Sequence, residues 1–94
     1  MNVLWFYKAA QDLEAIGRQI AKDNPSAAYE TVVRIRKAGD SLAQFPESGR
    51  IGRVAGTREL VVVGMAYLIP YRIKGDDLQI LRVFHGAQKW PDKF

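Results

Sequence analysis

Two different spacings of apolar residues divide the beginning of the chain. The short run Val3–Phe6 is apolar at every position, which predicts a strand covered on both faces. The segment from Ala9 to about Lys22 instead repeats its apolar residues every three or four positions. Leu13, Ile16 and Ile20 fall on one face, which predicts an amphipathic helix.

A second helix is predicted after a very short turn. Pro25 disfavours helical conformation in the residue before it, so the first helix ends by Asn24, whose side chain can cap a helix that starts at Pro25. A turn this short predicts an antiparallel helical hairpin. Gly39 marks a point where a neighbouring group could approach the backbone closely. The apolar stripe of the second helix comprises Ala28, Val32, Ile35, Leu42 and Phe45.

The second half of the chain is rich in β-branched and aromatic runs. Pro46–Gly56 has no periodicity and many turn-forming residues, so it is predicted to be a loop. Because Pro70 cannot donate a hydrogen bond, we expect a bulge at that position. Three strands are predicted, over Arg58–Val63, Ala66–Ile73 and Leu78–Phe84, the last two joined by a hairpin turn.

The order of elements is strand, helix, helix, strand, strand, strand. This order predicts an α+β fold in which a two-helix hairpin packs on a mostly antiparallel four-stranded sheet. The tail Gly86–Pro91 is expected to add one short helical turn. With 94 residues the chain has room for one core, so we expect a single domain over residues 1–94.

Charge and composition narrow the functional classes. The chain has 14 Lys and Arg against 10 Asp and Glu, and the resulting net charge of +4 lies entirely in residues 48–94. Such an excess suits nucleic-acid phosphates, an acidic protein, or solubility alone. The apolar run Leu60–Tyr71 is too short and too interrupted to span a bilayer. Together with the absence of cysteine, this favours a cytoplasmic protein without a membrane partner.

The sequence lacks the residue types that most kinds of active site require. With no cysteine and one histidine, the chain cannot build a thiol nucleophile or a zinc site of several imidazoles, and no phosphate-binding glycine loop is present. We therefore expect neither a metal nor a cofactor. His85, at the end of the last predicted strand, could act as a general acid or base beside cations that stabilise a phosphate transition state. The residues alone favour a structural role for His85.

Five arginines dominate the cationic half: Arg50, Arg53, Arg58, Arg72 and Arg82. Taken singly, each is best interpreted as a solvated charge whose stem packs on the surface. Taken together, the five arginines favour a shared binding patch, although no single one of them would indicate a binding site.

The closing segments Tyr67–Ile73 and Leu78–Pro91 strongly resemble the RelE/ParE superfamily of toxins from bacterial type II toxin-antitoxin systems. The pattern Phe45-Pro46-x-x-Gly49-Arg50 after the helical hairpin, and Arg58-Glu59-Leu60 in the next strand, extend the resemblance over nearly the whole chain. It implies an N-terminal strand beside the last strand. It also implies a cytoplasmic toxin that is held inactive by a co-expressed antitoxin. The C-terminal segment of the antitoxin is then expected to wrap around the toxin.

The superfamily divides by target: RelE-like members cut mRNA in the ribosome, whereas ParE-like members poison DNA gyrase. In the nuclease branch the third strand typically carries an arginine where this chain has Leu68. The second strand of that branch alternates lysines where Glu59 and Val61 stand here, and a further arginine aligns near Gln88. Without these cations the transition-state electrostatics of the nuclease are missing, which favours the ParE-like branch.

The resemblance therefore implies a non-catalytic toxin that binds gyrase and forms a hetero-oligomer with its antitoxin. Its binding residues are expected to be the five arginines together with Gln88 and Trp90. One alternative is a ribosome-dependent mRNA endonuclease with His85 as acid or base and Arg58 and Arg82 as phosphate ligands. Another is a degenerate member that still pairs with an antitoxin. The antitoxin is expected in a groove between hairpin and sheet or along an exposed strand edge.

Overall fold

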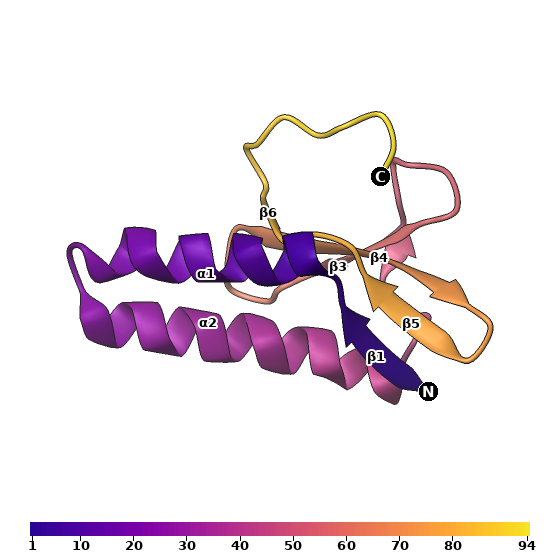
Figure 1. The fold of residues 1–94 in the computed structure, drawn as a ribbon, viewed down its shortest axis with the longest axis horizontal. Helices are drawn as coiled ribbons and strands as arrows, with labels where there is room; N and C mark the ends of the chain where they lie inside the picture. The colour runs from indigo at the N-terminus through magenta and orange to yellow at the C-terminus, as the bar shows by residue number, and fades with distance from the viewer.

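Two layers, a helical hairpin and a mixed sheet, make up the structure, a computed structural model that describes residues 1–94 (Figure 1). The helices are α1 (Tyr7–Ala21) and α2 (Pro25–Asp40), which continues into a single 3₁₀ turn, η1 (Ser41–Ala43). Neither helix is long and apolar enough to cross a lipid bilayer. The strands are β1 (Asn2–Trp5), β2 (Arg50–Ile51), β3 (Arg58–Val61), β4 (Tyr67–Lys74), β5 (Asp77–Ile80) and β6 (Phe84–His85).

The helical hairpin forms as its sequence predicts. Asn24 Oδ1 accepts the Ala27 N–H at 3.1 Å, and Pro25 is the first residue of α2. Gly39 is needed for close packing, because a Cβ atom there would overlap the ring of Trp5. The predicted stripe of α2 is wrong at Phe45, which lies beyond the helix and is 63% exposed.

The core lies between the hairpin and one face of the sheet. Leu13 of α1 and Ile35 of α2 pack in one buried cluster with Ile69, Tyr71 and Ile80 from the central strands. These residues alternate along the strands, so the residues between them face the other side of the sheet. That second face is covered by the C-terminal tail, which crosses above the sheet in Figure 1.

The sheet has the strand order β1-β5-β4-β3-β2, and β6 also pairs with β4. β1 runs parallel to β5, with Val3 opposite Leu78. The other pairings are antiparallel. The predicted α+β class, with a helical hairpin on a mostly antiparallel sheet, is therefore confirmed, and β1 lies beside β5, the first part of the strand predicted as the last. The predicted count of four strands is wrong: the sheet has six, because β2 forms in the predicted loop and the last predicted strand divides into β5 and β6.

The expected bulge exists, but not in the strand that contains Pro70. β4 runs unbroken through Pro70, whereas the strand predicted over Leu78–Phe84 divides into β5 and β6. Between the pairs Tyr71–Ile80 and Leu68–Phe84, the extra residue lies in the segment 81–83. Pro70 accepts the Leu81 N–H at 3.0 Å, so the missing donor of Pro70 faces this irregular segment. The irregularity caused by Pro70 therefore lies in the segment between β5 and β6, opposite Pro70, and not in β4 itself.

Two further predictions needed correction. The predicted loop over Pro46–Gly56 contains β2, in which Arg50 pairs with Glu59 at the edge of the sheet. The tail forms no helical turn; it makes a hydrogen-bonded turn in which the Gln88 N–H donates to the His85 carbonyl at 3.0 Å. The proximity of β3 gives Arg50 a strand partner that local sequence does not reveal.

Candidate functional site

A buried carboxylate organises the loop that contains β2. The Glu59 side chain is 2% exposed and accepts hydrogen bonds from Arg50 Nη2 at 3.0 Å and Arg53 Nε at 3.1 Å. The Arg53 backbone N–H also donates to this carboxylate, at 2.8 Å. Burial alone would raise the carboxyl pKa, but the hydrogen bonds from Arg53 and Arg50 outweigh burial and hold the pKa of Glu59 below its usual value. We call these three residues the Glu59 clamp.

The clamp also holds the C-terminal tail. The Arg53 guanidinium lies 3.8 Å from the centroid of the Trp90 ring, within range of a cation-π interaction. On the sheet, the Phe84 ring packs against Trp90 at 4.7 Å and against Phe94 at 6.3 Å between centroids. Trp90 Nε1 is buried without a hydrogen-bond partner. The tail is thus attached to the face away from the helices by rings and one guanidinium.

Arg58 and Tyr71 fasten the loop before β2 to the sheet. Arg58 Nη1 donates to the Gly49 carbonyl at 2.8 Å and to the Glu47 carbonyl at 3.3 Å. The Tyr71 hydroxyl donates to the Pro46 carbonyl at 2.7 Å and accepts the Gly49 N–H at 3.0 Å. Burial raises the pKa of Tyr71, so its hydroxyl keeps the proton it donates. Arg58 is therefore engaged with backbone carbonyls.

Arg82 forms a two-pronged ion pair with α1. Its Nε and Nη2 atoms donate to the two carboxylate oxygens of Asp12 at 2.8 and 3.0 Å, and the same carboxylate accepts the Val83 N–H at 2.9 Å. The hydrogen bonds that Arg82 donates to the Asp12 carboxylate raise the pKa of Arg82. Both side chains are partly buried. This pair ties the irregular segment between β5 and β6 to the helical layer.

His85 and Gln88 share the turn after β6. The imidazole Nδ1 of His85 accepts the Ala87 N–H at 3.1 Å, and the ring meets Tyr67 edge-on at 5.6 Å. The His85 backbone N–H donates to Gln88 Oε1. Since Nδ1 accepts a hydrogen bond, Nε2 carries the proton of the neutral ring. Both side chains therefore support the local turn, and the exposed His85 Nε2 is left without a protein partner.

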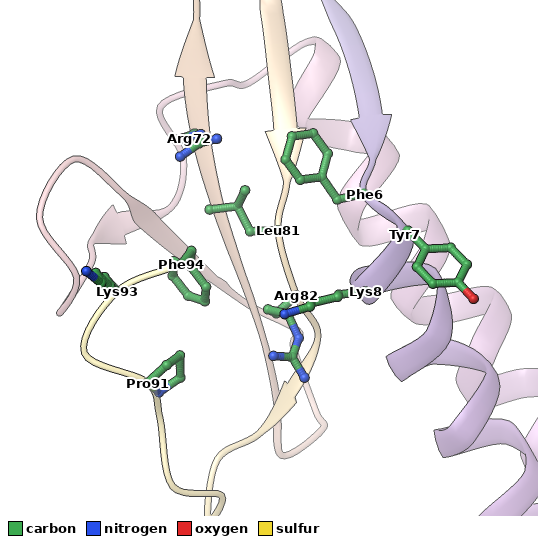
Figure 2. A pocket seen from close by; sticks show the side chains of 9 residues that line it. All are labelled: Phe6, Tyr7, Lys8, Arg72, Leu81, Arg82, Pro91, Lys93 and Phe94. Carbon is green, nitrogen blue, oxygen red and sulfur yellow. The ribbon is translucent and has the colours of Figure 1, made fainter.

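A cavity of about 440 Å³ lies between the tail and the sheet, and we call it the tail cavity (Figure 2). Arg72 projects into it from β4, with Nε donating to Gln79 Oε1 at 2.7 Å and the guanidinium 5.9 Å from the Phe6 ring centroid. The remaining lining residues come from the start of α1, the irregular segment and the tail: Tyr7, Lys8, Leu81, Arg82, Pro91, Lys93 and Phe94.

The structure groups the predicted binding residues into separate places. Arg50, Arg53 and Trp90 meet at the Glu59 clamp, and Arg72 and Arg82 line the tail cavity. Arg58 and Gln88 bond to local backbone. No three His, Asp or Glu side chains are placed to hold a metal ion.

The residues of the alternative nuclease set contact different parts of the fold. Arg58 pairs with Tyr71 on β4, and His85 pairs with Tyr67, four residues away on the same strand. That separation is about 13 Å along the strand. Arg82 is held by a third partner, on α1. Each of the three side chains thus has a different partner: backbone carbonyls for Arg58, Asp12 for Arg82 and the Ala87 N–H for His85.

Sequence reasoning missed the two acids that fix the arginines. Asp12 pairs with Arg82, 70 positions away, and nothing local distinguishes it from a solvated helical acid. Glu59 offered a signal, because it is a charged residue within the predicted strand Arg58–Val63, directly before the apolar run Leu60–Val63. The tail-cavity residues Lys8 and Lys93 were also missed, since only the fold brings the two ends of the chain together.

Comparisons with known proteins agree with this architecture. Residues 3–90 match the family model described as the ParE toxin of the type II toxin-antitoxin system, parDE. The candidate toxin Y4kP of Sinorhizobium fredii is 48% identical over 90 residues, which cover 96% of this chain and 93% of that protein. Toxin RelE2 of Caulobacter vibrioides is 41% identical, with 93% of this chain and 97% of the relative covered.

A solved structure leads to the same family. The chromosomal ParDE toxin-antitoxin system from P. aeruginosa contains a chain that superposes with a TM-score of 0.82 and 32% sequence identity, over 90% of this chain and 95% of that one. The family model spans nearly all of the sequence, and the fold agrees. This chain therefore belongs to the ParE toxin family of type II toxin-antitoxin systems, within the RelE/ParE superfamily.

Proposed function

We propose that this protein inhibits bacterial growth by poisoning DNA gyrase, without an active site of its own, and that a cognate antitoxin neutralises it in a cytoplasmic hetero-oligomer. The match to the ParE family model supports this reading. The names of the relatives do not distinguish gyrase from the ribosome as the target, because one relative is named RelE2 whereas the family model is that of ParE toxins. The support for a non-catalytic toxin comes from the contacts of the cations.

The single observation that carries the proposal is that the cations a nuclease would need are engaged elsewhere or replaced. Glu59 stands on β3 as a buried anion that holds Arg50 and Arg53. Leu68 is buried on β4, at the position from which the arginine of a nuclease would have to reach a phosphate. Stabilising a phosphorane-like transition state needs cations aimed at one point in space, whereas Arg50 and Arg53 are engaged with Glu59 and Arg58 with backbone carbonyls.

The antitoxin surface that fits best lies between α2 and β3. A groove of about 330 Å³ is lined by Leu60–Val63 together with Arg34 and Lys37. Val63 is 84% exposed, and β2 covers β3 only as far as Arg58 and Glu59, so the outer edge beyond them has no strand neighbour. Apolar side chains, an open strand edge and flanking cations suit an acidic, apolar antitoxin segment. Its association should slow as salt rises.

Substitution of His85 by alanine tests the target. We expect growth arrest by the His85→Ala variant to equal that of the wild type, because His85 supports a local turn and faces no assembled phosphate site. The purified toxin should inhibit gyrase supercoiling and trap cleaved DNA, and cellular transcripts should stay intact after induction. Gln88→Ala, which changes the same turn without touching the imidazole, is the matched control.

Two results would contradict the proposal. One is a toxin that leaves gyrase supercoiling untouched and traps no cleaved DNA. The other is cleavage of transcripts on the ribosome that disappears in His85→Ala but persists in Gln88→Ala. The second result would favour the RelE-like alternative, for which the free Nε2 of the exposed His85 ring is the supporting feature.

A further inference from the structure

Three cations around the tail cavity lack an acidic partner. Lys8, Arg72 and Lys93 line the cavity, and none of them has a carboxylate oxygen within 4.0 Å. The fourth cation, Arg82, is already paired with Asp12. No acidic side chain contributes to the lining. Because the three cations come from α1, β4 and the tail, the fold concentrates uncompensated positive charge on a cavity rather than on an open surface.

The interior of the same cavity is aromatic and aliphatic. Figure 2 shows the rings of Phe6 and Phe94 on either side of the Leu81 side chain, with Arg72 and Lys93 at the margin. Phe94 is 39% exposed, so part of its ring is available to a ligand. A flat, unsaturated group can stack on such rings while a linked anion meets the cations.

From this combination we infer that the tail cavity binds one nucleotide unit of a single-stranded nucleic acid. The base packs among Phe6, Leu81 and Phe94, and the phosphate meets Lys8, Arg72 and Lys93. The volume of about 440 Å³ is that of a small-ligand site. An acidic peptide would satisfy the same cations, but Asp and Glu side chains would leave the two rings without a flat partner.

The inference concerns binding alone. Neither His85 nor any acidic side chain lines the cavity, so nothing in its lining points to cleavage by a histidine or carboxylate base. The inference goes beyond the proposed action on gyrase and does not depend on it. It gives the toxin a direct contact with nucleic acid that is separate from the groove between α2 and β3.

Titration of the purified full-length protein with fluorescently labelled hexamers of deoxyuridine and uridine tests the inference. We expect saturable binding with at least one of the two hexamers. Phe94→Ala should weaken it at least about fivefold through lost stacking. Lys8→Gln should also weaken it and lower the slope of log affinity against log salt by about 0.7. Tighter binding of either hexamer supports the site and identifies the sugar.

Lys22→Gln is the matched control, because it removes the same charge from the opposite end of α1, about 21 Å away. Equal weakening by Lys8→Gln and Lys22→Gln would overturn the inference, since the attraction would then be unspecific. A labelled hexamer of glutamate that binds as tightly as the nucleotides would overturn it as well. No gyrase is present in this titration, so its failure leaves the proposed target standing.

Discussion

Replacing Glu59 by glutamine is expected to lower the free energy of unfolding by about 3 kcal/mol, the lower end of the range for breaking a buried ion pair. The carboxylate is 2% exposed and is the common acceptor of Arg50 and Arg53. Glutamine fills the same space but removes the charge and turns an N–H donor toward other donors. The lower end of the range applies because both guanidinium groups remain about half exposed.

Thermal unfolding measures this effect, and the midpoint should fall by about 15 °C for a domain of this size. Glu14→Gln is the control, because Glu14 forms a surface ion pair with Arg18 in which both side chains are 69% exposed. Its loss should change stability by only about 0.3 to 0.5 kcal/mol. If the two variants unfold at the same midpoint, Glu59 is not the organising group of the clamp.

The same pair of proteins gives a prediction about pH. The pKa of Glu59 is lowered in the folded protein, so its contribution is complete above the unfolded glutamate pKa of about 4.3. That contribution is lost as pH falls through the lower pKa of the folded state. The difference in stability between wild type and Glu59→Gln should therefore be constant near neutral pH and should narrow below about pH 4. A difference that widens on acidification would contradict this assignment.

Removing the Tyr71 hydroxyl is expected to cost about 2 kcal/mol of unfolding free energy. Tyr71→Phe leaves the Gly49 N–H and the Pro46 carbonyl without the partner that each now has at 3.0 and 2.7 Å. A buried donor or acceptor left unpaired loses its hydration without compensation, and here two are affected at once.

Urea unfolding and amide hydrogen exchange check this prediction together. The Gly49 amide should lose its protection in Tyr71→Phe, while the amides of β4 stay protected. Tyr29→Phe, at a tyrosine that is 73% exposed, should leave both measurements unchanged. A protected Gly49 amide in the Tyr71→Phe protein would show that the loop before β2 is held by Arg58 alone.

The parts of the fold that local chemistry determines could be predicted from the sequence. Asn24 and Pro25 specify the start of α2, and the spacing of Leu13, Ile16 and Ile20 specifies the buried face of α1. The division of the last predicted strand could not be predicted, because Val83 and Phe84 are both buried, one against the helices and one against the tail. A segment covered on both faces loses the alternation that would reveal its irregularity.

The candidate site was harder to predict for the same kind of reason. The excess of arginine in residues 48–94 is visible in the sequence, but its engagement depends on acids placed by the fold. Arg82 is compensated by Asp12, which belongs to the half of the chain that is neutral on its own. Counting charges by sequence segment therefore separates partners that lie 2.8 Å apart. The cations without an acidic partner at the tail cavity can be identified only once the ion pairs of the folded structure are known.

The parallel pairing of β1 with β5 sets a condition on when the protein can become toxic during its synthesis. β1 and the helical hairpin leave the ribosome first, but Val3 of β1 has no partner on a neighbouring strand until Leu78 of β5 has been synthesised. Until then the face of the hairpin that carries Leu13 and Ile35 has no sheet to cover it. Domains fold only as their segments emerge. A ribosome that stalls before β5 therefore releases no assembled toxin, and the antitoxin meets a folded partner only after the message has been translated through β5.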